Sequence, residues 1–160
     1  MCWLRLCVWS GMALGIGALA GCSSAGPSKV VPEKSVPVTG VVNLDGKPLG
    51  NTRVTFYPQE VEQGSGVASG FTDSAGKYEL QSLFGDKKVI GAAPGKYKVT
   101  ISVMVRPDGS PLPPDSQEPP INSGARESIA IEHSAFDRTE LSANVSSTGG
   151  TYNFDVKKLQ

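Results

Sequence analysis

The chain has 160 residues, which is enough for a single domain with one hydrophobic core. Its 15 basic and 15 acidic residues balance, so the sequence predicts no attraction to nucleic acid or to an anionic membrane surface. Nineteen glycines and twelve prolines are typical of a turn-rich β protein, and no long helical pattern competes with that interpretation.

Residues 1–21 have the three parts of a secretory signal peptide. Arg5 and the terminal amine give a weakly positive start, residues 6–20 are mostly apolar, and small residues close the segment. The uninterrupted apolar stretch is shorter than the ~20 residues that a membrane span needs, which disfavours an uncleaved transmembrane helix. We therefore expect this segment to be cleaved from the mature protein.

The segment ends in Leu-Ala-Gly-Cys at residues 19–22, a sequence that resembles the lipobox of bacterial lipoproteins. The resemblance implies that a diacylglyceryl group is attached to the thiol of Cys22 and that a peptidase cuts between Gly21 and Cys22. Two or more acyl chains anchor a protein stably on a membrane. An ordinary signal peptide with a chance cysteine is the alternative. Ser23 resembles the signals of lipoproteins that are not retained at the inner membrane, so the outer membrane is favoured over the inner membrane.

Residues 22–37 are expected to form a flexible tether. They contain Ser, Pro, Gly, Lys and Glu, and their valines show no sustained period. About 15 residues span at most roughly 50 Å when extended, so the folded domain can stand away from the bilayer. The three cysteines, Cys2, Cys7 and Cys22, all precede this domain, and we expect neither a disulfide nor a cysteine-based metal site in it.

From Val38 onward the dominant hydrophobic period is two, which predicts strands. The alternating segments are 38–44, 53–58, 67–73, 77–81, 96–105, 141–145 and 152–156. Turn sequences follow at residues 45–48, 73–76 and 147–150. Because apolar and polar positions alternate, each sheet should have one buried and one solvated face. The pattern therefore predicts an all-β, antiparallel sandwich over residues 38–158.

Two segments depart from this pattern. A proline-rich loop at about 106–125 holds six prolines and cannot be a central strand, because proline lacks a ladder donor. It is either a partner-binding arm or a connector, and we favour the connector. In residues 126–138, Ile129 and Ile131 could start a strand, and Phe136 could anchor the loop after it.

Several of these pieces resemble carboxypeptidase regulatory-like domains, which belong to the transthyretin-like (prealbumin-like) sandwiches. The resemblance is carried by Val-Thr-Gly-Val-Val at 38–42 with Asp-Gly-Lys-Pro-Leu at 45–49 and Val-Thr-Phe at 54–56. Thr-Asp-Ser-Ala-Gly-Lys-Tyr at 72–78 and Pro-Gly-Lys-Tyr-Lys-Val at 94–99 follow in order. The match covers about residues 38–103, and the C-terminal third only loosely. It implies a seven-stranded Greek-key sandwich that is accessory and non-catalytic.

The sequence offers little for catalysis. His133 is the only histidine, and Ser128 and Ser134 lie in no nucleophile motif, so no catalytic residues, metal ligands or cofactor are expected. Some transthyretin-like relatives are hydrolases that use several histidines and a distinctive C-terminal tetrapeptide, and both are missing here. Asp45 and Asp73 are explained by turn formation better than by calcium.

These observations lead us to expect a membrane-anchored lipoprotein of the cell envelope whose β-sandwich is a structural or protein-interaction module, with an unknown envelope protein as its partner. The alternative is a lipoprotein that binds a small ligand or a glycan. For a glycan, only Tyr57 and Phe84 are candidate aromatic platforms, because both tryptophans lie in the leader. Exposed sheet edges and the proline-rich loop are the expected contact surfaces.

Overall fold

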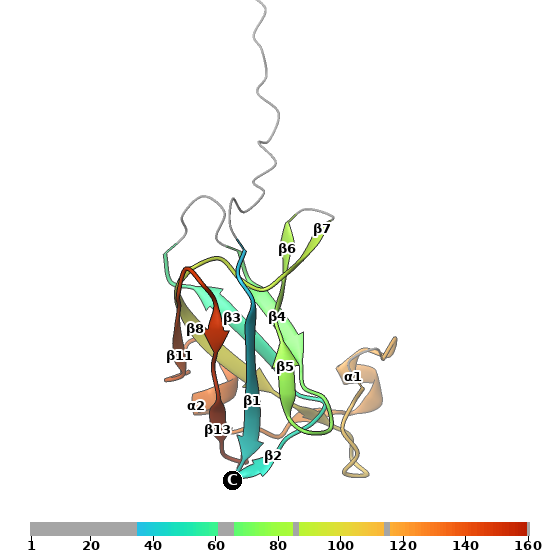
Figure 1. Ribbon diagram of the computed structural model, residues 1–160. Coiled ribbons are helices and arrows are strands. Elements are labelled where there is room, and N and C mark those ends of the chain that lie inside the picture. The colour runs from blue at the N-terminus through green and yellow to red at the C-terminus, as the bar shows by residue number, and fades with distance from the viewer. Residues whose placement is uncertain (1–34, 61–65, 85–86, 114–115, 160) are drawn as a thin grey trace, which may run out of the picture.

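The computed structural model describes residues 35–60, 66–84, 87–113 and 116–159. Over these residues the protein is an all-β sandwich of two main sheets packed around one core, as the alternating pattern predicts (Figure 1). The expected signal peptide (1–21), Gly21 and Cys22 of the cleavage and lipidation site, and residues 22–34 of the tether lie outside the described residues. Within the described ranges, no helix is long and apolar enough to cross a membrane.

The larger sheet has six strands, and all of its pairs are antiparallel. In spatial order these are β11 (Ser142–Val145), β8 (Gly95–Ser102), β3 (Arg53–Pro58), β4 (Ala68–Phe71), β6 (Gln81–Phe84) and β7 (Lys87–Ile90). The β6–β7 hairpin was not predicted. The signal that identifies it is the Gly-Asp pair at residues 85–86, which joins two short apolar-containing runs.

The smaller sheet is built around β1 (Val38–Leu44). Its other strands are β2 (Lys47–Pro48), β5 (Lys77–Glu79), β12 (Gly150–Thr151) and β13 (Phe154–Val156). β2 and β5 pair with β1 in antiparallel fashion, whereas β12 and β13 pair with it in parallel. The expectation of antiparallel pairing is therefore wrong for these two strands. Alternation reports which face of a strand is buried, and it carries no information about the direction of the neighbouring strand.

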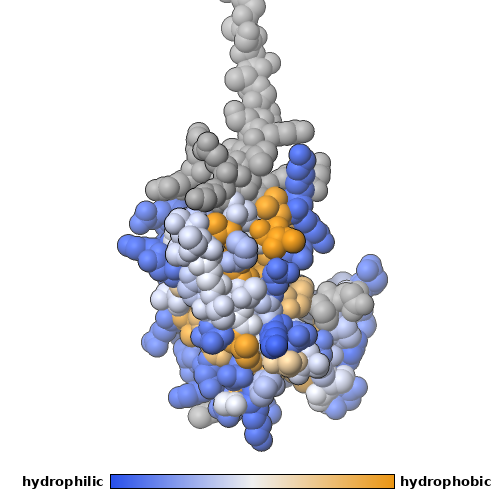
Figure 2. Space-filling model, viewed as in Figure 1, coloured by the Kyte–Doolittle hydropathy of each residue, from blue (hydrophilic) through white to orange (hydrophobic). Residues whose placement is uncertain are grey.

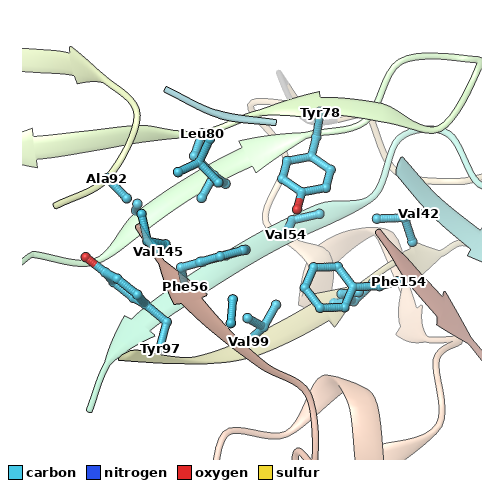
Figure 3. Packing of buried hydrophobic residues seen from close by; sticks show 14 of the residues in the cluster. Val42, Val54, Phe56, Tyr78, Leu80, Ala92, Tyr97, Val99, Val145 and Phe154 are labelled. Atoms are coloured by element: carbon cyan, nitrogen blue, oxygen red, sulfur yellow. The ribbon is translucent and has the colours of Figure 1, made fainter. Parts of the chain in front are cut away.

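The core lies between the two sheets and centres on Phe56 of β3, which is fully buried. The rings of Tyr97, Tyr78 and Phe154 surround it at centroid distances of 5.8, 6.5 and 6.2 Å (Figure 3). Tilted and edge-on ring pairs of this kind add to the stabilisation that apolar burial provides. Valines and isoleucines from both sheets complete the core, so the predicted buried positions of the strands are confirmed.

The folded domain begins before the predicted boundary at Val38. Val36 is only 5% exposed, and it exchanges backbone hydrogen bonds with Ala92 in both directions, at 2.9 and 3.0 Å. The Ser35 hydroxyl also donates to the Ile90 carbonyl. The last residues of the expected tether therefore belong to the sandwich, because an apolar side chain and a pair of backbone bonds fix them to the core.

The proline-rich loop is closed at its base by a small two-stranded sheet. β9 (Met104–Val105) pairs with β10 (Arg126–Glu127), and between them lies the one-turn helix α1 (Pro120–Ser123). Pro119 precedes this helix and Gly124 ends it in the left-handed conformation, at a φ of 66°. The described part of the loop is not a central strand, and its ends are held together by the β9–β10 pair.

Residues 128–139 cover part of the outward face of the larger sheet. Ile129 is buried, but Ile131 begins the short helix α2 (Ile131–Ser134) and is exposed, so the strand expected to start there is wrong. α2 contacts β8, and Phe136 lies edge-on to Tyr57 at 4.9 Å, as an anchor for the following loop. Because of this cover, Thr100 on the outward side of β8 is buried, and this part of the sheet has no solvated face.

Candidate interaction surfaces

The residues considered for catalysis do not assemble into a catalytic site. Within the described ranges, His133 has no hydrogen bond to a serine or an acid, and its buried Nδ1 has no partner. The Ser128 hydroxyl donates to the Val103 carbonyl, and the Ser134 hydroxyl donates to the Ala130 carbonyl, both at 3.2 Å. Hydroxyls committed to backbone carbonyls are not poised to be activated by a base.

Asp73 and Asp45 each form part of a turn between strands. One carboxylate oxygen of Asp73 accepts from the backbone N–H groups of Ala75 and Lys77, each at 2.9 Å. Asp45 and Gly46 have φ angles of 50° and 76° and form the two-residue loop between β1 and β2. Neither aspartate belongs to a group of three or more possible metal ligands in the described part of the chain.

Residues 128–139 do not cover the outward face of the larger sheet over β4, β6 and β7. The strand register shows which side chains lie on this uncovered part. Ser69 lies opposite Gln81, which in turn lies opposite Ile90, and Leu83 lies opposite Lys88. Residues that lie opposite each other in a sheet point to the same side, as do residues two positions apart on one strand. All five side chains therefore point to one side of the sheet.

That side is the outward one, because the alternate positions Ala68 and Ser82 are fully buried. Four large apolar side chains occupy it, and we call them the open face: Val67, Phe71, Leu83 and Ile90, which are 48%, 37%, 62% and 60% exposed. They are half of the eight large apolar residues found exposed among the described residues. A soluble protein seldom gathers exposed apolar side chains in this way unless they contact another molecule.

A shallow pocket of about 490 Å³ lies on the open face, and it mixes apolar and polar groups. It is lined by Ser69, Gly70, Phe71, Glu79, Gln81, Leu83 and Lys88. Next to it, the Arg53 guanidinium lies over the Phe71 ring at 5.0 Å. The open face therefore offers apolar contact area inside a frame of hydrogen-bonding and charged side chains, which is the composition of a protein interface.

The outward face of the smaller sheet is different. Lys77, Glu79 and Asp155 are exposed on its strands, and Figure 2 shows mainly hydrophilic surface over β1 and β13. The two sheets thus present unlike faces to solvent.

Of the two candidate aromatic platforms for a glycan, the structure describes the side-chain surroundings of Tyr57 alone. Tyr57 is half-buried beneath Phe136, while the Phe136 ring is itself 53% exposed and has the Lys98 ammonium 5.3 Å from its centroid. Phe84 ends β6, and its side chain lies outside the described part of the structure.

A second concave site lies at the base of the proline-rich loop, and it has a volume of about 520 Å³. We call it the basic pocket, because Arg106, Arg126 and Lys158 line it. Its other lining residues are Val105, Pro107, Gly124, Glu127, Ser128 and Leu159. Sequence reasoning did not identify it, because its residues come from three segments that are far apart in the chain.

No protein-family model matches the chain, and no curated protein matches it. Among solved structures, the chain is similar to a crystal structure of the major pilin subunit of Bacillus cereus, with a TM-score of 0.37 and 9% sequence identity. The similarity covers 79% of this chain and 30% of the pilin, so the chain spans less than a third of the pilin's length.

Proposed function

We propose that the protein is a lipid-anchored lipoprotein of the bacterial cell envelope, and that its sandwich is a non-catalytic module that binds another protein through the open face. The anchor rests on the resemblance of residues 19–22 to a lipobox, with Cys22 as the lipidated residue. The proposal that the sandwich is a non-catalytic module rests on its β-sandwich fold and on the resemblance of residues 38–103 to carboxypeptidase regulatory-like domains. Because fold alone does not fix function, the open face carries the proposal.

The physical reason is the free energy of leaving these side chains in water. Leu83 and Ile90 keep about 60% of their surface exposed, and burying apolar surface yields roughly 25 cal/mol per Å². Both side chains point away from the core, so their exposed apolar surface adds nothing to the stability of the monomer. A partner that covers Val67, Phe71, Leu83 and Ile90 would recover this energy, and the flanking Lys88 favours an acidic group at the partner's rim.

The anchor is tested by growing cells with labelled palmitate. The wild-type chain should incorporate label, and Cys22→Ala should incorporate none. The matched control is Cys7→Ala, which removes a leader cysteine outside the lipobox and should leave labelling unchanged. Persistent labelling of Cys22→Ala would refute the anchor.

The open face is tested by photo-crosslinking in intact cells. Benzoyl-phenylalanine at position 83 should give a discrete adduct, and the same group at the exposed Thr151 of the smaller sheet should give none. Ile90→Ser should weaken the adduct at position 83 without lowering Tm, because the Ile90 side chain is 60% exposed. Equal adducts at both positions, or an adduct with a second copy of the chain, would overturn the proposed interface.

A further inference from the structure

The basic pocket is formed by three segments that backbone hydrogen bonds hold side by side. Val105 lies opposite Arg126 in the β9–β10 pair, and the Ser128 N–H donates to the Val103 carbonyl at 3.0 Å. The Leu159 N–H donates to the Ser128 carbonyl at 2.8 Å, which brings the C-terminal segment alongside. The backbone of the pocket is therefore fixed before any ligand arrives.

Glu127 lines the pocket, but its carboxylate is already committed. One of its oxygens accepts from the backbone N–H groups of Val103, Ser128 and Ile129, at 3.0, 2.9 and 2.9 Å. The other oxygen accepts from the Ser102 hydroxyl at 2.5 Å. Neutral donors therefore hold the carboxylate in place, and none of the described basic side chains around it lies within salt-bridge distance of it.

Among the described residues, no acidic group lies within salt-bridge distance of the pocket's three cations. In the described part of the chain, the ion pair found within 4.0 Å joins Arg138 to Asp137, away from the pocket. Asp108 is near enough to Arg106 for the guanidinium to help lower the carboxyl's pKa, but that carboxylate accepts hydrogen bonds chiefly from Ser110. In a chain with no net charge, this is a local excess of positive charge.

Apolar groups lie among these charges. Val105, Pro107 and Leu159 line the same pocket, and Leu159 is 49% exposed. A volume of about 520 Å³ is within the range of roughly 300–1,000 Å³ that is usual for small-molecule sites. The lining therefore matches a ligand with an anionic end and a compact apolar body, whereas a fully hydrated anion would leave the apolar lining unused.

The position of the pocket leaves it accessible. Residue 35, where the described domain begins, lies at one end of the sandwich, and the C-terminal end, which contributes Lys158 and Leu159, lies at the other (Figure 1). β1 runs between these ends, and its seven residues span about 20 Å. A protein held by its N-terminus would thus present the basic pocket on the side away from its attachment.

We propose that the basic pocket binds a small organic anion, in which a phosphate or carboxylate group contacts Arg106, Arg126 and Lys158 and an apolar body lies against Val105, Pro107 and Leu159. Arginine is suited to this role because its planar guanidinium binds phosphate and carboxylate oxygens in pairs. The inference is independent of the open face and of the lipid anchor, since none of its residues belongs to either.

The test is calorimetric titration of the purified full chain in a non-ionic detergent with four probes: phenyl phosphate, benzoate, inorganic phosphate and benzyl alcohol. Phenyl phosphate should bind saturably, and benzoate should compete with it if the site takes either anionic group. Inorganic phosphate and benzyl alcohol should each bind at least about tenfold more weakly, because each lacks one half of the ligand. Which of the first two probes binds tighter identifies the preferred anion.

Two variants and a control assign the binding to this pocket. Arg126→Gln and Arg106→Gln should each weaken phenyl phosphate binding by about tenfold, because each removes a charge-assisted contact. Lys47→Gln, which removes an exposed cation from β2, should change the affinity by less than about twofold. Unchanged affinity in both arginine variants, no saturable binding, or equal affinity for inorganic phosphate and phenyl phosphate would overturn the proposal. Thermal melts of each variant verify that the fold is retained.

Discussion

Glu127→Ala should destabilise the protein far more than the loss of a half-exposed acid normally would. Its carboxylate accepts four hydrogen bonds. Three come from the backbone N–H groups of Val103, Ser128 and Ile129, and one comes from the Ser102 hydroxyl. Hydrogen bonds to a charged group contribute about 1.5–3 kcal/mol each. Because Glu127 is only half-buried, water can replace part of this network, and we expect a net loss of about 3 kcal/mol.

For a domain of this size, such a loss lowers Tm by about 10 °C. Thermal denaturation followed by circular dichroism measures it, and amide exchange locates it. The Val103, Ser128 and Ile129 amides should exchange faster in the variant, whereas the Phe56 and Val99 amides of the central strands should lose protection only through the global decrease.

Two matched variants separate the network from simple charge removal. Glu127→Gln retains one carbonyl oxygen for the backbone N–H groups and should lose about half as much stability. Glu140→Gln removes a negative charge from an exposed side chain and should shift Tm by less than about 2 °C. If Glu127→Ala melts within about 2 °C of the wild type, the carboxylate does not hold the base of the basic pocket, and the reasoning above is refuted.

The core, a close approach of two strands and the proline-rich loop can each be tested by a simple perturbation. Burial raises the pKa of Tyr78 and of Tyr97 above their ordinary value of 10.0, so the stability that their protonated forms provide is present below pH 10 and is lost as the pH rises through the folded-state pKa. Absorbance at 295 nm should show these two tyrosines titrating only as the protein unfolds, and early titration of both would contradict their burial. Gly40→Ala should prevent normal folding or cost more than about 2 kcal/mol, because a Cβ there would lie 1.8 Å from the Tyr152 carbonyl oxygen; a wild-type melt would refute this close approach. Deleting residues 107–123 should shift Tm by less than about 3 °C, since none of the described residues in that span is buried; a larger loss would show that the loop stabilises the core.

The sequence predicted the strands well because alternation is a local property. Each of the seven expected segments contains a strand, and the apolar positions of 53–58 and 96–105 point into the core as expected. Pairing is non-local, which explains the main errors. Nothing in residues 150–156 indicates that they run parallel to β1, and nothing around Val36 indicates that its backbone pairs with Ala92.

Covering segments were harder to predict than strands. Ile129 and Ile131 were equally plausible starts of a strand by composition, yet the first is buried and the second is exposed on α2. The difference arises because a backbone hydrogen bond from Ala130 to the Lys157 carbonyl fixes this segment against the C-terminal strand region. Such a contact joins residues 27 positions apart in the chain, and local pattern does not reveal it.

The candidate sites were accessible to sequence reasoning to different degrees. The open face follows from register once the β6–β7 hairpin is recognised, because Leu83 and Ile90 then fall on the outward side. The basic pocket was not predictable, since Arg106, Arg126 and Lys158 are scattered among fifteen basic residues and only the fold brings them to one cavity. Conversely, the lipobox is entirely a sequence feature, and the described structure begins beyond it.

The proposed anchor is tested most directly by intact-mass and N-terminal peptide mass spectrometry of the protein isolated from its native membrane. The account predicts a chain that starts at Cys22 and carries acyl mass on that residue. A chain that retains Met1, or one whose residue 22 carries a free thiol, would contradict it.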